Sequence, residues 1–152
     1  MRTLLLSLLI LPATVHADDW TPTAEQTAVY KALSIRDPAP SCEEVEALTS
    51  EPVATLRVVV EHAELPPWAP MRAAHCLVTG HPTEAETDML AWVGGEQTRG
   101  LALLVFGSLE VLPTEVVRRV ATAALAGPHR ADVEERLSEF GIQIPPAGPT
   151  TD

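Results

Sequence analysis

The sequence is poor in positive charge and in aromatic residues. Of its 152 residues, 10 are lysine or arginine and 21 are aspartate or glutamate, so the net charge is −11. Aromatic residues make up 4% of the chain. Nucleic acids and anionic membranes require a dense positive surface, and single strands also require aromatic stacking platforms. The composition therefore argues against nucleic acid as a partner, while an apolar share of 46% argues against a disordered chain.

The chain also lacks the local motifs of common enzyme and metal sites. It contains no GxSxG, Walker A, GxGxxG or EF-hand pattern, and no HExxH pair. Its carboxylates follow expected helix faces, which is typical of solvated surface. One weak cation site, formed by His81, Glu84 and Asp88, remains as an alternative. We expect no catalytic residue, no metal and no cofactor.

The first residues have the layout of an export signal. Arg2 precedes an apolar run, Leu4–Leu11, which is followed by Pro12 and by Val15-His16-Ala17. The run is too short to cross a bilayer, which needs about 20 residues. The pattern predicts a signal peptide over residues 1–17, cleaved after Ala17, and a periplasmic or extracellular location with no membrane span. Cleavage leaves nine basic and 21 acidic residues, a net charge of −12.

Cys42 and Cys76 are the two cysteines of the chain. An even number in an oxidising compartment favours one disulfide. Two separate buried thiols are the alternative, because a free cysteine behaves as a small hydrophobe. The spacing matches neither a CxxC redox motif nor a zinc pattern, so it gives the least support to chemistry at these positions.

Helix signals divide the rest of the chain. Proline, glycine, serine and threonine interrupt apolar patterns of helical period, and the β-branched stretch Thr55–Val60 lacks the alternation of a strand. Ser41 is a good N-cap, and Thr83 with Glu86 matches a capping box. The stretch Leu101–Phe106 is apolar on every side, so its helix is expected to be the most buried. The expected helices are 23–33, 41–49, 52–64, 68–79, 83–93, 96–111, 113–127 and 129–140. A packed domain is expected over 18–141 and a flexible, Pro/Gly-rich tail over 142–152.

These segments recur as helix pairs. Leu48–Pro52 resembles Val78–Pro82 at an offset of 30 residues, and Pro113 continues the spacing after a further 31. Met71–Leu77 aligns with Thr98–Leu104 at an offset of 27. A pair that recurs at such a period is typical of stacked repeats, in which neighbouring pairs cover each other's apolar stripes.

The start of the second helix in each pair resembles the HEAT or HEAT-like repeat family. The match is carried by Arg72-Ala73-Ala74, by Arg99 and by Arg130, over about residues 41–141. The resemblance implies an all-α fold, a short right-handed α-solenoid of about four antiparallel helix pairs. It also implies that Arg72, Arg99 and Arg130 are repeat-structural residues, since in that family the arginine usually partners an aspartate of the preceding turn. No such acid precedes Arg72, and a generic antiparallel helical bundle remains the alternative.

Trp68 is the candidate for partner binding. It lies in a proline-rich corner, 66–70, which would hold an exposed indole rigidly as an interface hot spot. The alternative, which we favour, is that Trp68 folds back on its own helix.

The sequence thus predicts an exported, non-catalytic protein-binding or scaffolding module with an unidentified protein partner. This function rests on the usual role of the fold. The alternative is a small-ligand-binding or enzymatic helical domain with a site in a cleft between helices. A convergent polar pocket that contains His75 or the acids would favour that alternative.

Overall fold

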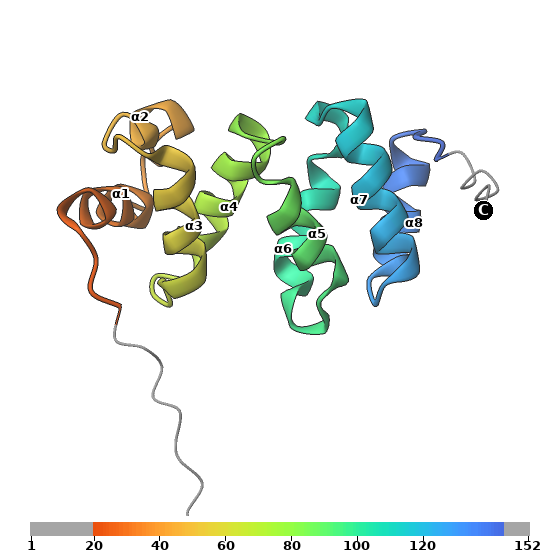
Figure 1. The fold of residues 1–152 in the computed structure, drawn as a ribbon, viewed down its shortest axis with the longest axis horizontal. Helices are drawn as coiled ribbons and strands as arrows, with labels where there is room; N and C mark the ends of the chain where they lie inside the picture. Colours follow the sequence, from red (N-terminus) through yellow and green to blue (C-terminus); the bar gives the residue numbers. More distant parts are fainter. Residues whose placement is uncertain (1–19, 145–152) are drawn as a thin grey trace, which may run out of the picture.

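The computed structural model describes residues 20–144, which form eight α-helices, two 3₁₀ turns and no β-strand (Figure 1). The expected signal segment, 1–17, and residues 145–152 of the expected tail lie outside the described residues. No helix between residues 20 and 144 has the length and apolarity needed to cross a bilayer. The α-helices are α1 (Ala24–Ser34), α2 (Cys42–Glu46), α3 (Pro52–His62), α4 (Trp68–Gly80), α5 (Glu86–Gly94), α6 (Arg99–Gly107), α7 (Thr114–Ala126) and α8 (Arg130–Glu139), and the 3₁₀ turns are η1 (Glu96–Thr98) and η2 (Leu109–Val111).

The helix ends follow the local signals in most places. Ser41 caps α2 in a reciprocal box with Glu44, because each side chain accepts a hydrogen bond from the other residue's backbone N–H. The expected box at Thr83 is wrong: α5 begins at Glu86 with no side-chain cap, and Arg119 of α7 binds the Glu86 carboxylate instead. The expected helix 96–111 is divided into η1, α6 and η2.

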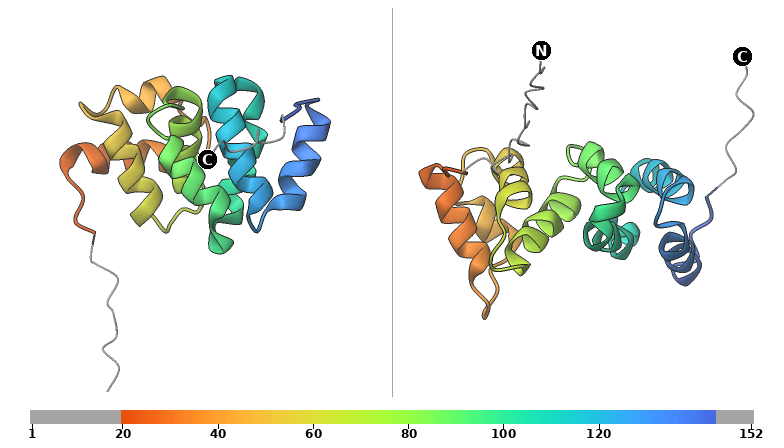
Figure 2. Two further views of the ribbon diagram at one scale, coloured as in Figure 1. Left: turned by 45° about the vertical axis from the view of Figure 1, so that its right-hand side comes forward. Right: turned by 90° about the horizontal axis from the view of Figure 1, so that it is seen from below.

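The helices advance along the long axis of the molecule, from α1 at one end to α8 at the other (Figures 1 and 2). α3 packs against α4, α5 against α6, and α7 against α8. α4, α6 and α8 follow one another in a row, and α5 lies beside α7. The first pair is irregular, because α2 is short and α1 lies against both α3 and α4.

The core is a continuous apolar layer between these helices. Its members recur three or four residues apart within each helix, as Leu56 and Val59 do in α3 and Val133 and Leu137 do in α8. The expectation that the helix of Leu101–Phe106 is the most buried is wrong. Leu103 is 39% exposed, and α4 and α7 carry more buried residues than α6. Among residues 20–144 the side of α6 that carries Leu103 faces solvent, so the all-round apolar pattern overstated the burial of this helix.

The last helix ends in a Schellman motif. Gly141 has a φ of +64°, and the N–H of Ile142 donates to the Leu137 carbonyl at 2.9 Å. Ile142 and Ile144 then pack against the core. Residues 142–144, which the sequence assigned to the tail, are therefore packed on the domain.

The Cys42–Cys76 disulfide is present and joins α2 to α4, with Cα atoms 5.3 Å apart. Cys76 is 3% exposed and belongs to the core. α2 is five residues long and buries one of them, Val45, so it has little packing of its own. The cross-link is therefore the main tie that holds α2 against the rest of the molecule.

Loss of this cross-link is expected to lower stability markedly. A disulfide that closes a loop of this length contributes roughly 3–4 kcal/mol, mainly by restricting the unfolded chain. Urea unfolding of the protein should show a lower midpoint after reduction, and the double variant Cys42→Ser/Cys76→Ser should match the reduced protein. An unchanged midpoint in both would contradict this account.

Candidate functional site

Arg72 holds the end of α1. Its guanidinium donates to the carbonyl oxygens of Leu33 at 3.1 Å, of Arg36 at 3.2 Å, and of Ile35. The last carbonyls of a helix have no partner within the helix, and they form the negative end of its dipole. Arg72 therefore ties α4 to the end of α1, and its partners are backbone carbonyls of α1 and not an acid of the preceding turn.

The other two arginines of the repeat pattern have different partners. Arg99 makes a two-pronged ion pair with Asp132 of α8, with N–O distances of 2.9 and 3.1 Å. The Arg99 guanidinium holds the pKa of Asp132 below its ordinary value. Arg130 pairs with Glu134 one turn along its own helix. The three positions are thus similar in sequence but not equivalent in structure.

Trp68 neither stands free nor folds back on its own helix. Its indole N–H donates to the Ser34 carbonyl at the end of α1, at 3.3 Å. The Arg36 guanidinium lies 5.9 Å from its ring centroid, a cation–π contact. Trp68 is half-buried, and its hydrogen bond holds it against the end of α1, so its role in partner binding stays a prediction.

The weak cation site at His81, Glu84 and Asp88 is not formed. Asp88 is paired with Arg57 of α3 at 2.8 Å. His81 faces away, with its Nε2 3.1 Å from Glu46 of α2, outside hydrogen-bonding geometry. Within residues 20–144 no group of histidines, cysteines and acids is placed to hold a metal ion.

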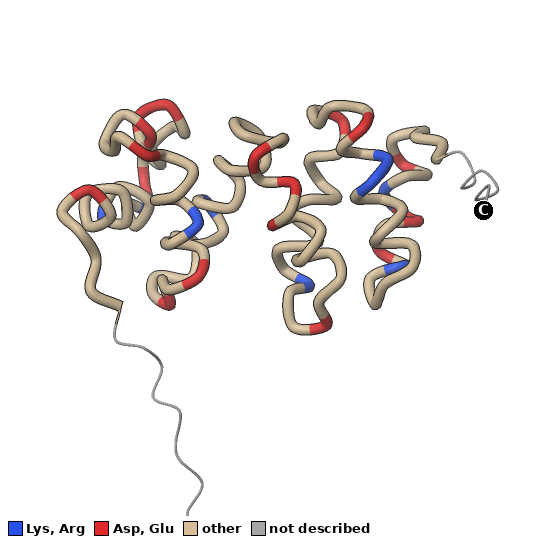
Figure 3. The backbone as a smooth tube through the Cα atoms, in the orientation of Figure 1, with Lys and Arg blue, Asp and Glu red and all other residues tan. Residues whose placement is uncertain are grey.

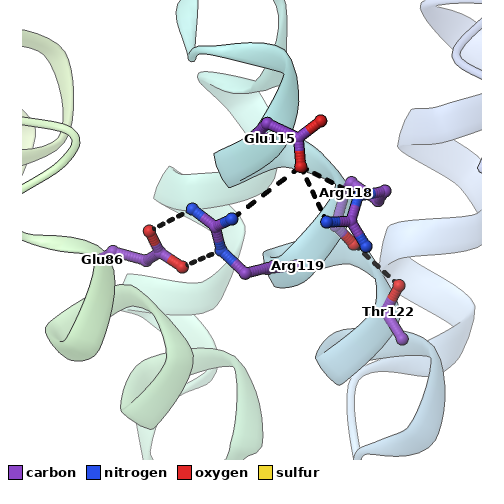
Figure 4. Close-up of polar contacts among 5 residues, drawn as sticks. All are labelled: Glu86, Glu115, Arg118, Arg119 and Thr122. Atoms are coloured by element: carbon purple, nitrogen blue, oxygen red, sulfur yellow. Dashed lines mark hydrogen bonds and ion pairs between the residues drawn. The ribbon is translucent and has the colours of Figure 1, made fainter.

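Ion pairs tie the odd-numbered helices together. Arg57 joins α3 to α5 through Asp88, and Arg119 joins α7 to α5 through Glu86 (Figure 4). Arg119 also approaches Glu115 of its own helix at 3.9 Å. The hydrogen bond from Arg119 lowers the pKa of Glu86, whose side chain is 17% exposed.

The arginines of the described residues are all engaged within the fold. Seven bind carboxylates or carbonyls, and Arg36 lies over Trp68. Several exposed acids, by contrast, have no cationic partner among residues 20–144. These include Glu43, Glu51, Glu84, Glu96, Glu110 and Glu135. Acidic residues gather at the helix ends along both edges of the molecule (Figure 3). The charge that the folded surface offers to a partner is therefore negative.

Open hollows lie near each end of the part of the chain that the structure describes. The first, which we call the N-terminal hollow, has a volume of about 420 Å³. The second, the C-terminal hollow, has a volume of about 370 Å³. The lining of the N-terminal hollow includes Trp20, Pro22, Tyr30, His62, Glu64 and Leu65. The C-terminal hollow is lined by Leu109, Glu110, Leu112, Thr114, Val117 and Ile142.

The N-terminal hollow contains an aromatic cluster. The Trp20 and His62 rings stack, with centroids 5.9 Å apart, and Tyr30 meets Trp20 edge-on at 5.8 Å. The Tyr30 hydroxyl donates to the Leu65 carbonyl, which fixes the loop after α3 against α1. The side chain of Leu65 is left 71% exposed beside the rings.

Sequence reasoning missed this cluster because its members come from distant segments. Trp20 precedes α1, Tyr30 lies within it and His62 ends α3. No spacing rule links these positions. The available signal was indirect: one of few aromatic residues stands three positions before the Thr23 N-cap, where the chain enters its first helix.

No family model matches this chain, and neither the curated proteins nor the solved structures contain a similar one. The HEAT-like resemblance therefore rests on the residues of this sequence alone.

Substitution of Arg72 should destabilise α1. Arg72→Met keeps most of the apolar stem but removes the hydrogen bonds to the α1 carbonyls, and a bond to a charged group contributes about 1.5–3 kcal/mol. We expect a lower urea midpoint and faster amide exchange over residues 30–36. Arg130→Met, which removes an ion pair within one helix, is the matched control. It should change the urea midpoint and the amide exchange only slightly. Equal effects of the two variants would contradict the assigned role.

The Arg119–Glu86 pair should make the free energy of unfolding depend on pH. Because the folded pKa of Glu86 is lowered, its contribution is complete above the ordinary glutamate pKa and is lost as pH falls through the folded value. Arg119→Gln should therefore be less stable than wild type near neutral pH, and the two should converge in acid. Urea midpoints measured across this range test the expectation, with Arg136→Gln, which breaks a pair within α8, as control. A difference that stays constant with pH would contradict it.

Proposed function

We propose that the protein is an exported, non-catalytic protein-binding or scaffolding module. Its architecture is a short right-handed α-solenoid of HEAT-like helix pairs. The row formed by α4, α6 and α8, and the side-by-side packing of α5 and α7, support this architecture. The disulfide supports export, since such bonds persist in oxidising compartments.

The observation that carries the binding function is the N-terminal hollow. It combines aromatic side chains with a leucine that is 71% exposed. Tryptophan and tyrosine are enriched among the anchor residues of protein interfaces. Single exposed apolar residues are common on protein surfaces, but here Leu65 borders a hollow of about 420 Å³ in which a partner side chain can be buried.

The alternative is a small-ligand-binding or enzymatic domain. The C-terminal hollow favours it by volume, because ligand sites occupy about 300–1,000 Å³. Its lining, however, supplies one carboxylate, Glu110, beside apolar side chains and one threonine. His75, the histidine that a polar cleft was expected to contain, is exposed on α4 and lines neither hollow. The protein-binding proposal is therefore preferred.

Affinity capture from the native envelope or medium tests the function. Immobilised wild-type protein is expected to retain a discrete partner in stoichiometric amount at moderate salt. Leu65→Ser should retain at least about fivefold less, because truncation of an interface anchor costs more than ~1 kcal/mol.

Leu103→Ser is the matched control, because it removes another exposed leucine outside both hollows. This variant should retain the partner at the wild-type level. Failure of the wild type to retain any stoichiometric protein would contradict the binding function. Equal retention by the two leucine variants would show that the N-terminal hollow is not the interface.

A further inference from the structure

The acidic residues at the N-terminal hollow favour an occupant with positive charge. Glu64 lines it and is exposed, and Glu61, 64% exposed at the side chain, lies one turn earlier on α3. The ring of His62, which also lines the hollow, lies 3.8 Å from the Glu61 carboxylate. No lysine or arginine is among the described residues that line the hollow. A positively charged group of a partner therefore meets the Glu64 carboxylate, which has no lysine or arginine beside it in the lining of the hollow.

The rest of the lining suits the stem of a long side chain. Pro22, Ala63 and Leu65 are apolar, and Trp20 and Tyr30 present aromatic rings. Lysine and arginine bury their aliphatic stems on apolar surface while the charged head stays near water or an anion. Aromatic rings attract such heads, and arginine is the more frequent partner because its planar head also stacks. The hollow thus combines apolar side chains, aromatic rings and the Glu64 carboxylate.

We propose that the N-terminal hollow receives an arginine side chain of a partner protein, flanked by apolar residues. This inference rests on the proposed function and names the chemistry of its partner. The arginine stem lies along Leu65 and Pro22, and the guanidinium pairs with Glu64 beside the aromatic rings. The surplus acidic charge of the surface draws the same segment in before contact. The partner's docking segment is therefore basic, whereas the arginines of residues 20–144 are engaged within the fold.

Peptide titration followed by amide NMR of the exported protein tests the proposal. The probe is a blocked glycine–leucine–arginine–leucine–glycine peptide, and its partner is the same peptide with citrulline, which keeps the shape of arginine without its charge. The arginine peptide should shift amide signals over residues 20–30 and 61–65. Binding of the citrulline peptide should be about fivefold weaker, from loss of one cation–π contact and one exposed ion pair.

Two exposed acids provide the matched variants. Glu64→Gln should weaken the arginine peptide about fivefold and leave the citrulline peptide unchanged, because it removes only the charge partner. Glu135→Gln, on α8 at the far end of the molecule, should change neither. Both positions are exposed, so neither variant disturbs the core.

Three results would overturn the proposal. They are equal binding of the two peptides, shifts that spread over the acidic edges instead of the hollow, and no shift at all at millimolar peptide. Each is distinguishable from failure of the proposed function. If the capture experiment still separates Leu65→Ser from Leu103→Ser, the hollow binds a protein through an anchor other than arginine.

Discussion

The structure depends on one interaction: the burial of apolar side chains between successive helices. α3, which buries Leu56 and Val59, packs against α4 and also against α1, and α4 in turn packs against α6, so the core is shared between successive helices. The ion pairs between α3 and α5, and between α5 and α7, run in the same direction as this shared packing. These ion pairs fix the relative position of α3, α5 and α7, whereas the burial of apolar side chains supplies most of the stability. Open hollows lie near both ends of the described residues.

The number and nature of the helices could be predicted because their signals are local. Pro113 before Thr114, Gly127 after Ala126 and Ser41 before Cys42 each mark a helix end through their own backbone or side-chain chemistry. The disulfide was predictable from the even cysteine count. The predicted capping box at Thr83 was wrong because a distant arginine, Arg119, binds Glu86. The predicted burial of α6 was wrong because an apolar pattern does not show which helices will lie beside it. The N-terminal hollow was not predictable, since only folding brings Trp20, Tyr30 and His62 together.

The arginines show how similar sequence positions acquire different roles. Arg72 and Arg99 stand at corresponding places in the repeat pattern, yet the first holds backbone carbonyls of α1 and the second holds Asp132. The difference follows from what precedes each one. α1 lies across two helices at the N-terminal end, so Arg72 meets a helix terminus, whereas Arg99 meets the side of a regular neighbour. With the arginines of residues 20–144 engaged in this way, the folded surface keeps mainly its carboxylates for contact with other molecules, and these lie at the edges.

The disulfide lies entirely within the N-terminal half of the chain, which gives the two halves different responses to a broken backbone. The exposed turn at residues 47–51 and the loop at 64–67 both lie between Cys42 and Cys76. A protease that cuts either segment leaves two fragments joined through sulfur, with α2 still fastened to α4 and the aromatic cluster still close to its partners. A cut between α7 and α8 separates the two fragments, because within residues 20–144 no cross-link lies beyond Cys76. Under proteolysis the end that carries the N-terminal hollow would therefore outlast the opposite end.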